Sequence, residues 1–439
     1  MHPVGAAFHP LVRWAFYVFM FSLPFEWPNR SIPVEVTTLT GMVFLLATLI
    51  QPRACFARLP TALWWFGAAL YMYWVSFVVA GAAYPNDAVK AFALRVSLVL
   101  VFWAAYNLMR DERIATRALL TFGLACLALA VLSVGGAVHL DEEWVKKSGR
   151  VTLFGQNPNR AGLILALGAL ALVGLTYGRD RKLLRPRLLV WPLLAVIGIA
   201  IVNTGSRGSL LALVLGLWMF AVGGRSLLVK IRSAVVAVLI IAFLAGVAWQ
   251  LPIMRKRFQQ AQHGNLAGRE KIFPAAWGLF RERPLLGWGP SQNKYELAKR
   301  LPEEFRTWRD THNLVLELLT STGVLGTIPF LAGMGLCVWG AWTARRGTHG
   351  MLPFAMSTAL LMGNMSGNGI ALKLLWIVLA YGAATSSLLA PQRAPPPRQP
   401  RTGAPPPPVG RTSRPCNAKA SDLWAVGISA RVRRPPVST

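Results

Sequence analysis

The sequence contains few charged residues and very few acidic ones. Only 14% of its 439 residues are charged, and 17 aspartates and glutamates stand against 46 lysines and arginines. Hydrophobic residues make up 54% of the chain, and the mean hydropathy is +0.45. A water-soluble domain of this length needs a more polar surface, so the composition excludes one and indicates a polytopic membrane protein.

Cysteine is scarce as well. The four cysteines (Cys55, Cys126, Cys337 and Cys416) show no paired spacing, so neither a disulfide framework nor a thiolate metal site is expected. Regular alternation of apolar and polar residues is also missing, which argues against the strands of a membrane barrel.

Long apolar runs are present instead, each about the length that crosses roughly 30 Å of hydrocarbon. They predict an all-α polytopic membrane protein with about twelve transmembrane helices. The predicted spans lie near residues 11–25, 34–50, 61–82, 90–109, 115–138, 154–178, 188–203, 208–223, 233–251, 312–342, 351–365 and 369–389.

The loops between these runs predict the orientation. Basic residues gather in alternate short loops, near residues 53–58, 110–117, 179–187, 225–232 and 345–346, and such loops remain in the cytoplasm. The intervening loops hold fewer basic residues or carry acids such as Glu26, Asp87 and Glu142. Both termini are therefore expected in the cytoplasm. The net charge of +29 is explained by basic residues that set the orientation in the membrane and contact anionic lipid, rather than by binding of nucleic acid.

Two polar segments interrupt this pattern. The loop at residues 252–311 has twelve basic and six acidic residues, is expected on the outer side, and predicts an anionic ligand. Residues 269–283 within it predict a short amphipathic helix, with Ile272, Ala276, Trp277 and Phe280 on its apolar face. The Pro- and Arg-rich residues 391–439 predict a disordered cytoplasmic tail that touches lipid headgroups, which leaves residues 1–390 as the transmembrane domain.

A short polar turn at residues 203–209 divides an apolar stretch. Ser206 is expected to cap the following helix, with Arg207 in its first turn. A guanidinium next to free backbone N–H groups forms an anion site. The alternative is an arginine that reaches lipid phosphates.

The second outer element runs from Arg150 to Arg160, directly before a span. Asn157 is expected to cap that helix, with Pro158 in its first turn. Arg150, Asn157, Asn159 and Arg160 are candidate contacts to sugar or phosphate oxygens. A simple capping turn is the alternative.

His312 opens the next span, and Asp310 or Thr311 is its expected cap. A helix N-terminus disfavours the imidazolium, so a neutral ring able to accept a proton is expected; an interfacial histidine without chemistry is the alternative. Glu317 follows five residues later and is a further candidate for substrate binding. For it and for Lys373, a turn into the last span, a pair with each other and a contact with a ligand are both open, because the sequence does not place them together.

These elements, in this order, resemble the bacterial O-antigen ligase family. That family shares a superfamily with O-antigen polymerases and protein O-oligosaccharyltransferases. The resemblance covers about residues 150–375. It rests on residues 154–159 (FGQNPN), Ser206-Arg207-Gly208, Gly268-Arg269-Glu270, Gly287-Trp288-Gly289, and His312-Asn313 followed by Glu317 and Gly323.

The resemblance implies a GT-C-like membrane glycosyltransferase in the bacterial inner membrane, with a periplasmic active site. Such a ligase transfers a glycan from undecaprenyl pyrophosphate to a sugar hydroxyl of lipid A-core, without nucleotide sugar, metal or other cofactor. The two essential arginines of the family correspond to Arg207 and Arg269, and its essential histidine to His312.

The residue chemistry agrees with these roles. A departing pyrophosphate needs positive charge, which Arg207 and Arg269 supply, while His312 is the expected general base for the acceptor hydroxyl. No carboxylate pair at glycosidase spacing and no Asp-rich metal motif is evident. The alternatives within the superfamily are a polymerase and a protein O-oligosaccharyltransferase. A lipid-linked glycan flippase is a further alternative, although the repeated interrupted spans typical of carriers are missing.

Overall fold

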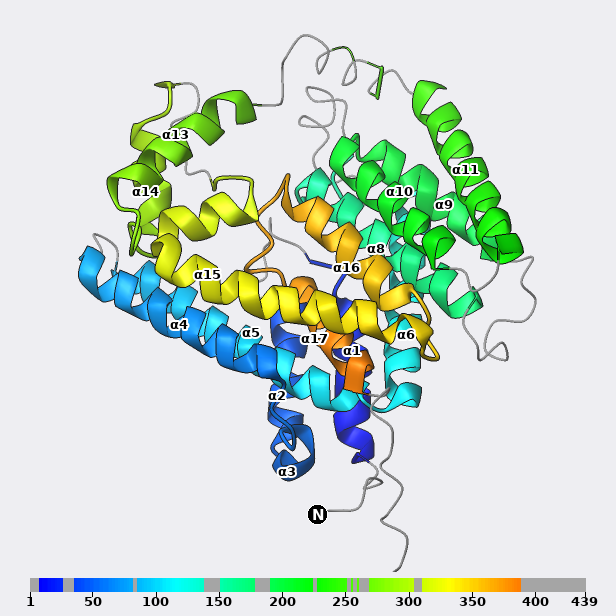
Figure 1. Ribbon diagram of the computed structural model, residues 1–439. Helices are drawn as coiled ribbons and strands as arrows, with labels where there is room; N and C mark the ends of the chain where they lie inside the picture. Colours follow the sequence, from blue (N-terminus) through cyan, green and yellow to red (C-terminus); the bar gives the residue numbers. More distant parts are fainter. Residues whose placement is uncertain are drawn as a thin grey trace, which may run out of the picture. The chain divides into compact units, whose positions relative to one another are not determined.

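The computed structural model describes residues 8–26, 35–81, 85–137, 151–177, 190–223, 227–250, 268–303 and 310–387, with residues 254, 255 and 259. All regular elements in these ranges are helices (Figure 1), which confirms the all-α prediction for this part of the chain. Arg150, Cys416 and the predicted tail at 391–439 lie outside the described residues.

A helix occurs at each of the twelve predicted positions. These helices are α1 (Pro10–Ser22), α2 (Val36–Thr48), α4 (Thr61–Ala80), α5 (Pro85–Met109), α6 (Glu112–Val134), α8 (Pro158–Tyr177), α9 (Val190–Asn203), α10 (Arg207–Val222), α11 (Leu227–Gln250), α15 (Leu314–Thr343), α16 (Leu352–Asn364) and α17 (Lys373–Ser387). Four further elements accompany them in the described ranges: α3 (Pro52–Cys55), α13 (Arg269–Glu282), α14 (Gln292–Lys299) and η3 (Ala344–Arg346).

Five of the helices in the described ranges are long and apolar enough to cross a membrane, namely α4, α5, α6, α8 and α15. The shorter apolar helices include α2, α9, α10 and α17. The chain is therefore an all-α membrane protein. Crossing of the membrane by all twelve helices remains a prediction.

Helix α4 shows how the apolar surface is divided between lipid and protein. Trp64, Tyr71 and Val78, seven residues apart, are 70%, 65% and 61% exposed. This spacing puts them on one stripe of the helix, which suits lipid. Phe66 and Tyr73 are buried on the side that packs against its neighbours, above all α15.

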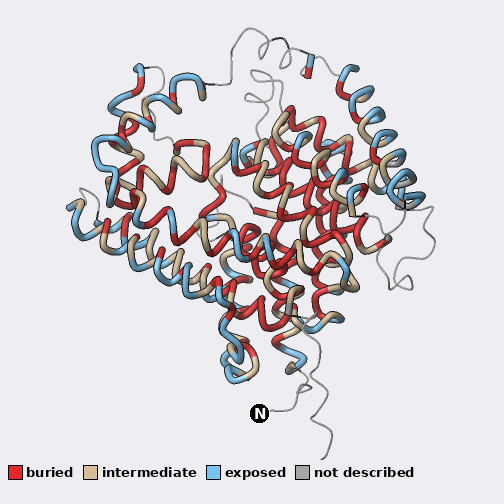
Figure 2. The backbone as a smooth tube through the Cα atoms, viewed as in Figure 1, coloured by how far each residue is buried: buried red, intermediate tan, exposed pale blue. Residues whose placement is uncertain are grey.

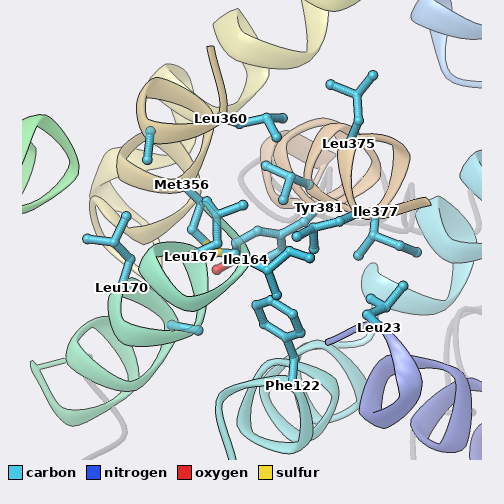
Figure 3. Close-up of a cluster of buried hydrophobic side chains, with 14 of the residues drawn as sticks. Leu23, Phe122, Ile164, Leu167, Leu170, Met356, Leu360, Leu375, Ile377 and Tyr381 are labelled. Atoms are coloured by element: carbon cyan, nitrogen blue, oxygen red, sulfur yellow. The ribbon is translucent and has the colours of Figure 1, made fainter. Parts of the chain in front are cut away.

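The buried core lies where α6, α8, α16 and α17 meet, with the end of α1 (Figure 3). Phe122, Ile164, Met356 and Tyr381 are among the side chains that point into it. Figure 2 shows the contrast with the outer helices: α8 is buried over most of its length, whereas α11 is exposed along much of it. The well-packed helices of the core provide a rigid support for the polar turns at their ends.

Helices α13 and α14 form a separate small apolar cluster with the start of α15. Ile272, Ala276 and Leu279 of α13 pack against Leu297 and Leu301. The amphipathic helix predicted for residues 269–283 is confirmed. Its predicted apolar face is wrong at Trp277, which is 50% exposed, because Leu279 takes the buried position.

The long loop is joined to α15 through a break in that helix. Gly323 has φ 61° and interrupts the helical backbone. The residues around the break bond to the loop instead: Trp288 and Gly289 N–H donate to Thr320 and Ser321 C=O (2.8 and 2.9 Å), and Val324 N–H donates to Pro284 C=O (2.8 Å). The freed backbone groups are thus satisfied within the protein, as membrane depth requires.

Candidate active site

The start of α10 has the predicted geometry. Ser206 is the N-cap, its Oγ accepts a hydrogen bond from Ser209 N (3.3 Å), and Arg207 is the first helical residue. Gly205 supplies the reversal with φ 63°. The turn therefore presents a guanidinium at a helix N-terminus, where free N–H groups favour an anion.

Arg269 meets the same region from the long loop. It is the first residue of α13, after Gly268 at φ 84°, and its Nη2 donates to the Ser366 carbonyl at 2.8 Å. Gly208, next to Arg207, also lies against this serine, because a Cβ built on Gly208 would be 2.5 Å from Ser366 Oγ. The connection between α16 and α17 thus brings the starts of α10 and α13 together.

The two arginines influence each other electrostatically. Burial lowers the pKa of Arg269, the positive charge of Arg207 lowers it further, and the carboxylate of Glu270 acts in the opposite direction. Arginine remains charged under such shifts, so the protein holds two like charges close together. This arrangement is favourable when an anion binds between or beside them.

His312 lies directly before α15 in a left-handed conformation, with φ 49°, which a side-chain-bearing residue rarely adopts. Its Nδ1 is 2.9 Å from Asp310 Oδ1, and its backbone N–H donates to the same oxygen at 3.1 Å. Asn313, not Asp310 or Thr311, caps α15: its Oδ1 accepts from Val315 N and Leu316 N. The cap prediction is wrong because Asp310 is engaged by the histidine.

The carboxylate of Asp310 determines which ring nitrogen of His312 is available. Burial raises the pKa of Asp310, but hydrogen bonds and charge from His312 lower it more, with a small contribution from Lys294, and the net pKa is below the ordinary value. In the neutral form of the ring, the contact to Asp310 favours the proton on Nδ1, as an orienting carboxylate does. Nε2 is then the nitrogen that can accept a proton.

Hydrogen bonds join the His312 turn to the rest of the site. Asn313 Nδ2 donates to the Met365 carbonyl (3.2 Å), next to the partner of Arg269. Glu317 Oε2 accepts from Thr311 N and Oγ1 (3.3 and 3.2 Å), and its Oε1 accepts from Asn293 Nδ2 (3.2 Å). Glu317 is 3% exposed and holds the turn in place through these bonds. Of the alternatives that the sequence left open, a pair with Lys373 is not what occurs.

Lys373 belongs to a different group of charges, which we call the tether cluster: Glu26, Glu35, Arg160 and Lys373. Arg160 is ion-paired with Glu26. Lys373 Nζ lies 3.5 Å from Glu26 and 3.3 Å from Glu35. The cluster joins the start of α8 and the start of α17 to the chain before α2. A substrate contact by Arg160 remains a prediction.

Asn157 and Asn159 lie beside the tether cluster at the start of α8. Asn157 Oδ1 accepts from Asn159 N at 2.9 Å, as expected for the predicted turn. The Asn159 carbonyl accepts from Ser209 Oγ at 3.0 Å, which brings this turn to the first turn of α10. The element therefore borders the Arg207 turn, although a substrate contact by either asparagine remains a prediction.

Two apolar cavities lie below these turns, along α10 and α11. One, of about 380 Å³, is lined by side chains such as Ala169, Leu217 and Phe243. The other, of about 410 Å³, includes Leu210 and Trp249. A hydrocarbon chain fits the chemistry of both.

Sequence reasoning missed several members of this region. Ser366 and Met365 act through their carbonyls, which carry no sequence signal. Glu26 was assigned only to an outer loop. Arg95 was passed over, although an arginine inside the apolar run 90–109 is itself a signal of function.

Residues 192–331 match a family model described as O-antigen ligase. This match over about a third of the chain supports an assignment to the O-antigen ligase family. The matched region begins in α9 and ends in α15, so it contains Arg207, Arg269 and His312. No curated protein matches the chain. Members of the O-antigen ligase family are glycosyltransferase-like ligases that act on lipid-linked glycans and lipid A-core, and the match supports an enzyme role for this membrane protein at that general level.

Proposed function

We propose that the protein is an O-antigen ligase that transfers a glycan from undecaprenyl pyrophosphate to a sugar hydroxyl of lipid A-core. The proposal places the chain in the bacterial inner membrane with both termini in the cytoplasm and the site in the periplasm. The observation that carries it is the convergence of three elements on residues 365 and 366. Arg269 donates to the Ser366 carbonyl, Asn313, next to His312, donates to the Met365 carbonyl, and Gly208, next to Arg207, lies against the Ser366 side chain.

The reaction is a single displacement. The acceptor oxygen attacks the anomeric carbon, the bond from that carbon to the pyrophosphate oxygen breaks, and undecaprenyl pyrophosphate leaves with the electron pair. His312 Nε2 takes the acceptor proton, an effect of roughly 10²–10⁴-fold for general bases. Attack opposite the leaving group inverts the anomeric centre.

The two arginines stabilise the leaving group in this proposal. Negative charge grows on the pyrophosphate as the bond breaks, and fixed cations in a partly buried site reduce its cost without reorganisation. The N-terminal N–H groups of α10 add to this. The chain's own residues thus supply the positive charge, and no divalent-ion requirement is proposed.

The apolar cavities along α10 and α11 suit the lipid part of the donor. They lie on the helix that begins with Arg207, so a polyprenyl chain in them would direct its pyrophosphate toward this arginine. A polymerase or a protein O-oligosaccharyltransferase would use the same arginines and histidine with another acceptor.

The test is a transfer assay with the purified full-length protein in detergent and a chelator. Lipid-linked glycan is supplied with lipid A-core, glycan or a pilin-like peptide. Transfer to lipid A-core by the wild type, and a loss of about 10²-fold or more in His312→Ala, Arg207→Ala and Arg269→Ala, are expected. Arg281→Ala, an exposed change in α13, is the matched control.

Transfer to peptide or glycan alone would show that the acceptor is a protein or a glycan and not lipid A-core. Near-normal transfer by the three folded variants would refute the proposed site.

A further inference from the structure

An arginine lies well inside an apolar helix. Arg95 is ten residues after the start of α5, about 15 Å along its axis, where a charged side chain is costly and usually functional. Its Nη1 donates to the Ala91 carbonyl of the same helix at 3.1 Å, and its guanidinium carbon is 4.2 Å from the centroid of the Tyr73 ring. Its buried Nε has no hydrogen-bond partner among the described residues.

Arg95 borders a cavity of about 150 Å³, with room for about one sugar ring. The polar side chains around it come from α4, α5, α14, α15 and the connection before α17. They include Tyr73, Arg95, Asn293, Lys294, Glu317 and Asn368.

Two further polar atoms at this cavity lack partners in the described part of the chain, namely Tyr73 Oη and Asn293 Oδ1. Tyr73 is 3% exposed and Asn293 is 1% exposed. Buried polar groups are nearly always hydrogen-bonded, so three such atoms around one cavity indicate a polar ligand. A packing defect would not gather donors and acceptors in this way.

The cavity adjoins the His312 turn on residues other than Arg207 and Arg269. Glu317 lines it and also holds Thr311, directly before His312. Asn368 lies two residues after Ser366, the partner of Arg269. The His312 turn is therefore linked to two basic centres, one formed by Arg207 and Arg269 and one by Arg95 and Lys294.

The charges define the ligand class. Arg95 and Lys294 are cationic, while the single carboxylate, Glu317, already accepts hydrogen bonds from Asn293 and Thr311. The hydroxyl and amide groups suit sugar oxygens. We propose that this cavity binds one anionic sugar residue, carrying a carboxylate or a phosphate, of a substrate that reacts at His312. The role of this sugar in a reaction at His312 rests on the proposed transferase function.

Binding is tested apart from transfer. The thermal stability of the purified full-length protein is measured with galacturonate, mannose 6-phosphate and neutral methyl galactoside. A saturable rise in Tm with an anionic sugar, and none with the neutral one, is expected for the wild type and for Arg207→Ala. Arg95→Gln and Lys294→Gln should weaken this binding by roughly tenfold or more, and Arg281→Gln, which removes an exposed charge of α13, should not.

The same variants are then compared in the transfer assay with substrates that have or lack the acidic group. If the variants have a higher KM for the anionic acceptor, the bound anionic sugar belongs to the acceptor. If they have a higher KM for the anionic donor, it belongs to the donor. In both cases kcat and the KM for neutral substrates should change little in Arg95→Gln, the variant that does not act on Asp310. Anionic sugars that bind Arg95→Gln and Lys294→Gln as they bind the wild type, or that bind only through Arg207, would overturn the proposal.

The two measurements separate the failures. If the wild type transfers no glycan but binds anionic sugars through Arg95 and Lys294, the proposed function fails and the subsite stands. If it transfers glycan but the subsite variants bind anionic sugars normally, the subsite alone fails.

Discussion

The tether cluster and the arginine pair Arg207–Arg269 use the same kind of side chain for different ends. In the tether cluster, Arg160 and Lys373 each lie against a carboxylate of the protein. In the arginine pair, two cations lie close enough to influence each other, with Glu270 as the opposing charge. In the tether cluster the charges pair within the protein, whereas in the arginine pair two like charges lie close enough to raise each other's cost, which an anion would reduce.

The largest effect on stability should come from the tether cluster. Glu26→Gln leaves Arg160 and Lys373 without one of their carboxylates at a site where Glu26 is 3% exposed. Removing one partner of a buried ion pair typically costs about 3–5 kcal/mol. The measurement is denaturant unfolding in detergent. Lys373→Met added to Glu26→Gln should recover part of the lost stability. If Glu26→Gln alone leaves the denaturant midpoint unchanged, the tether cluster does not stabilise the fold, and the contrast with the arginine pair fails.

The next effect concerns the orientation of His312. Asp310→Asn removes the carboxylate that accepts from Nδ1, so the ring loses its preferred tautomer, and kcat should fall by about 10²-fold or more with little change in KM. Arg281→Ala again serves as the exposed control. A variant with wild-type kcat would show that the 2.9 Å contact has no part in the reaction.

The pH dependence of the same variant gives a second check. The pKa of Asp310 is below its ordinary value. Its ionised form therefore stabilises the fold at pH values above that ordinary pKa. The contribution is lost as the pH falls through the lowered pKa. The difference in unfolding free energy between wild type and Asp310→Asn should therefore be constant near neutral pH and shrink in acid. A difference that grows in acid contradicts the assignment.

The smallest effect should come from the break in α15. At Gly323 an added Cβ would clash with the Leu285 carbonyl group, and φ is 61°, so Gly323→Ala should lower the unfolding free energy by about 1–3 kcal/mol. Gly335→Ala in the same helix is the matched control, because a Cβ there meets nothing within 4 Å. Equal midpoints for the two variants would exclude a structural role for the loop insertion.

Local features were predictable from the sequence, and distant contacts were not. The apolar runs located the helices because burial in lipid requires them. Ser206 and Asn157 were identified as caps because their partners lie within three residues. At α15 three polar residues compete for one cap, and the choice of Asn313 depends on Glu317 and on the backbone of residue 365.

The meeting of Arg207, Arg269 and His312 had no basis in local sequence. Arg269 and Ser366 are 97 residues apart, and the packing of α13 on α15 and of α16 on both α15 and α10 connects them. The resemblance named the three residues, whereas the structure adds Asp310, the contacts to residues 365 and 366, and the neighbouring Arg95 cavity.

The most direct test of the central claim is the binding of inorganic pyrophosphate to purified protein, measured by titration calorimetry at fixed salt. Arg207→Gln and Arg269→Gln should each weaken binding by roughly tenfold or more. The Glu26→Gln/Lys373→Met double variant, which removes one cation and one anion of the tether cluster, should bind as the wild type does. Loss of binding in the double variant, with retention in the two arginine variants, would contradict the account.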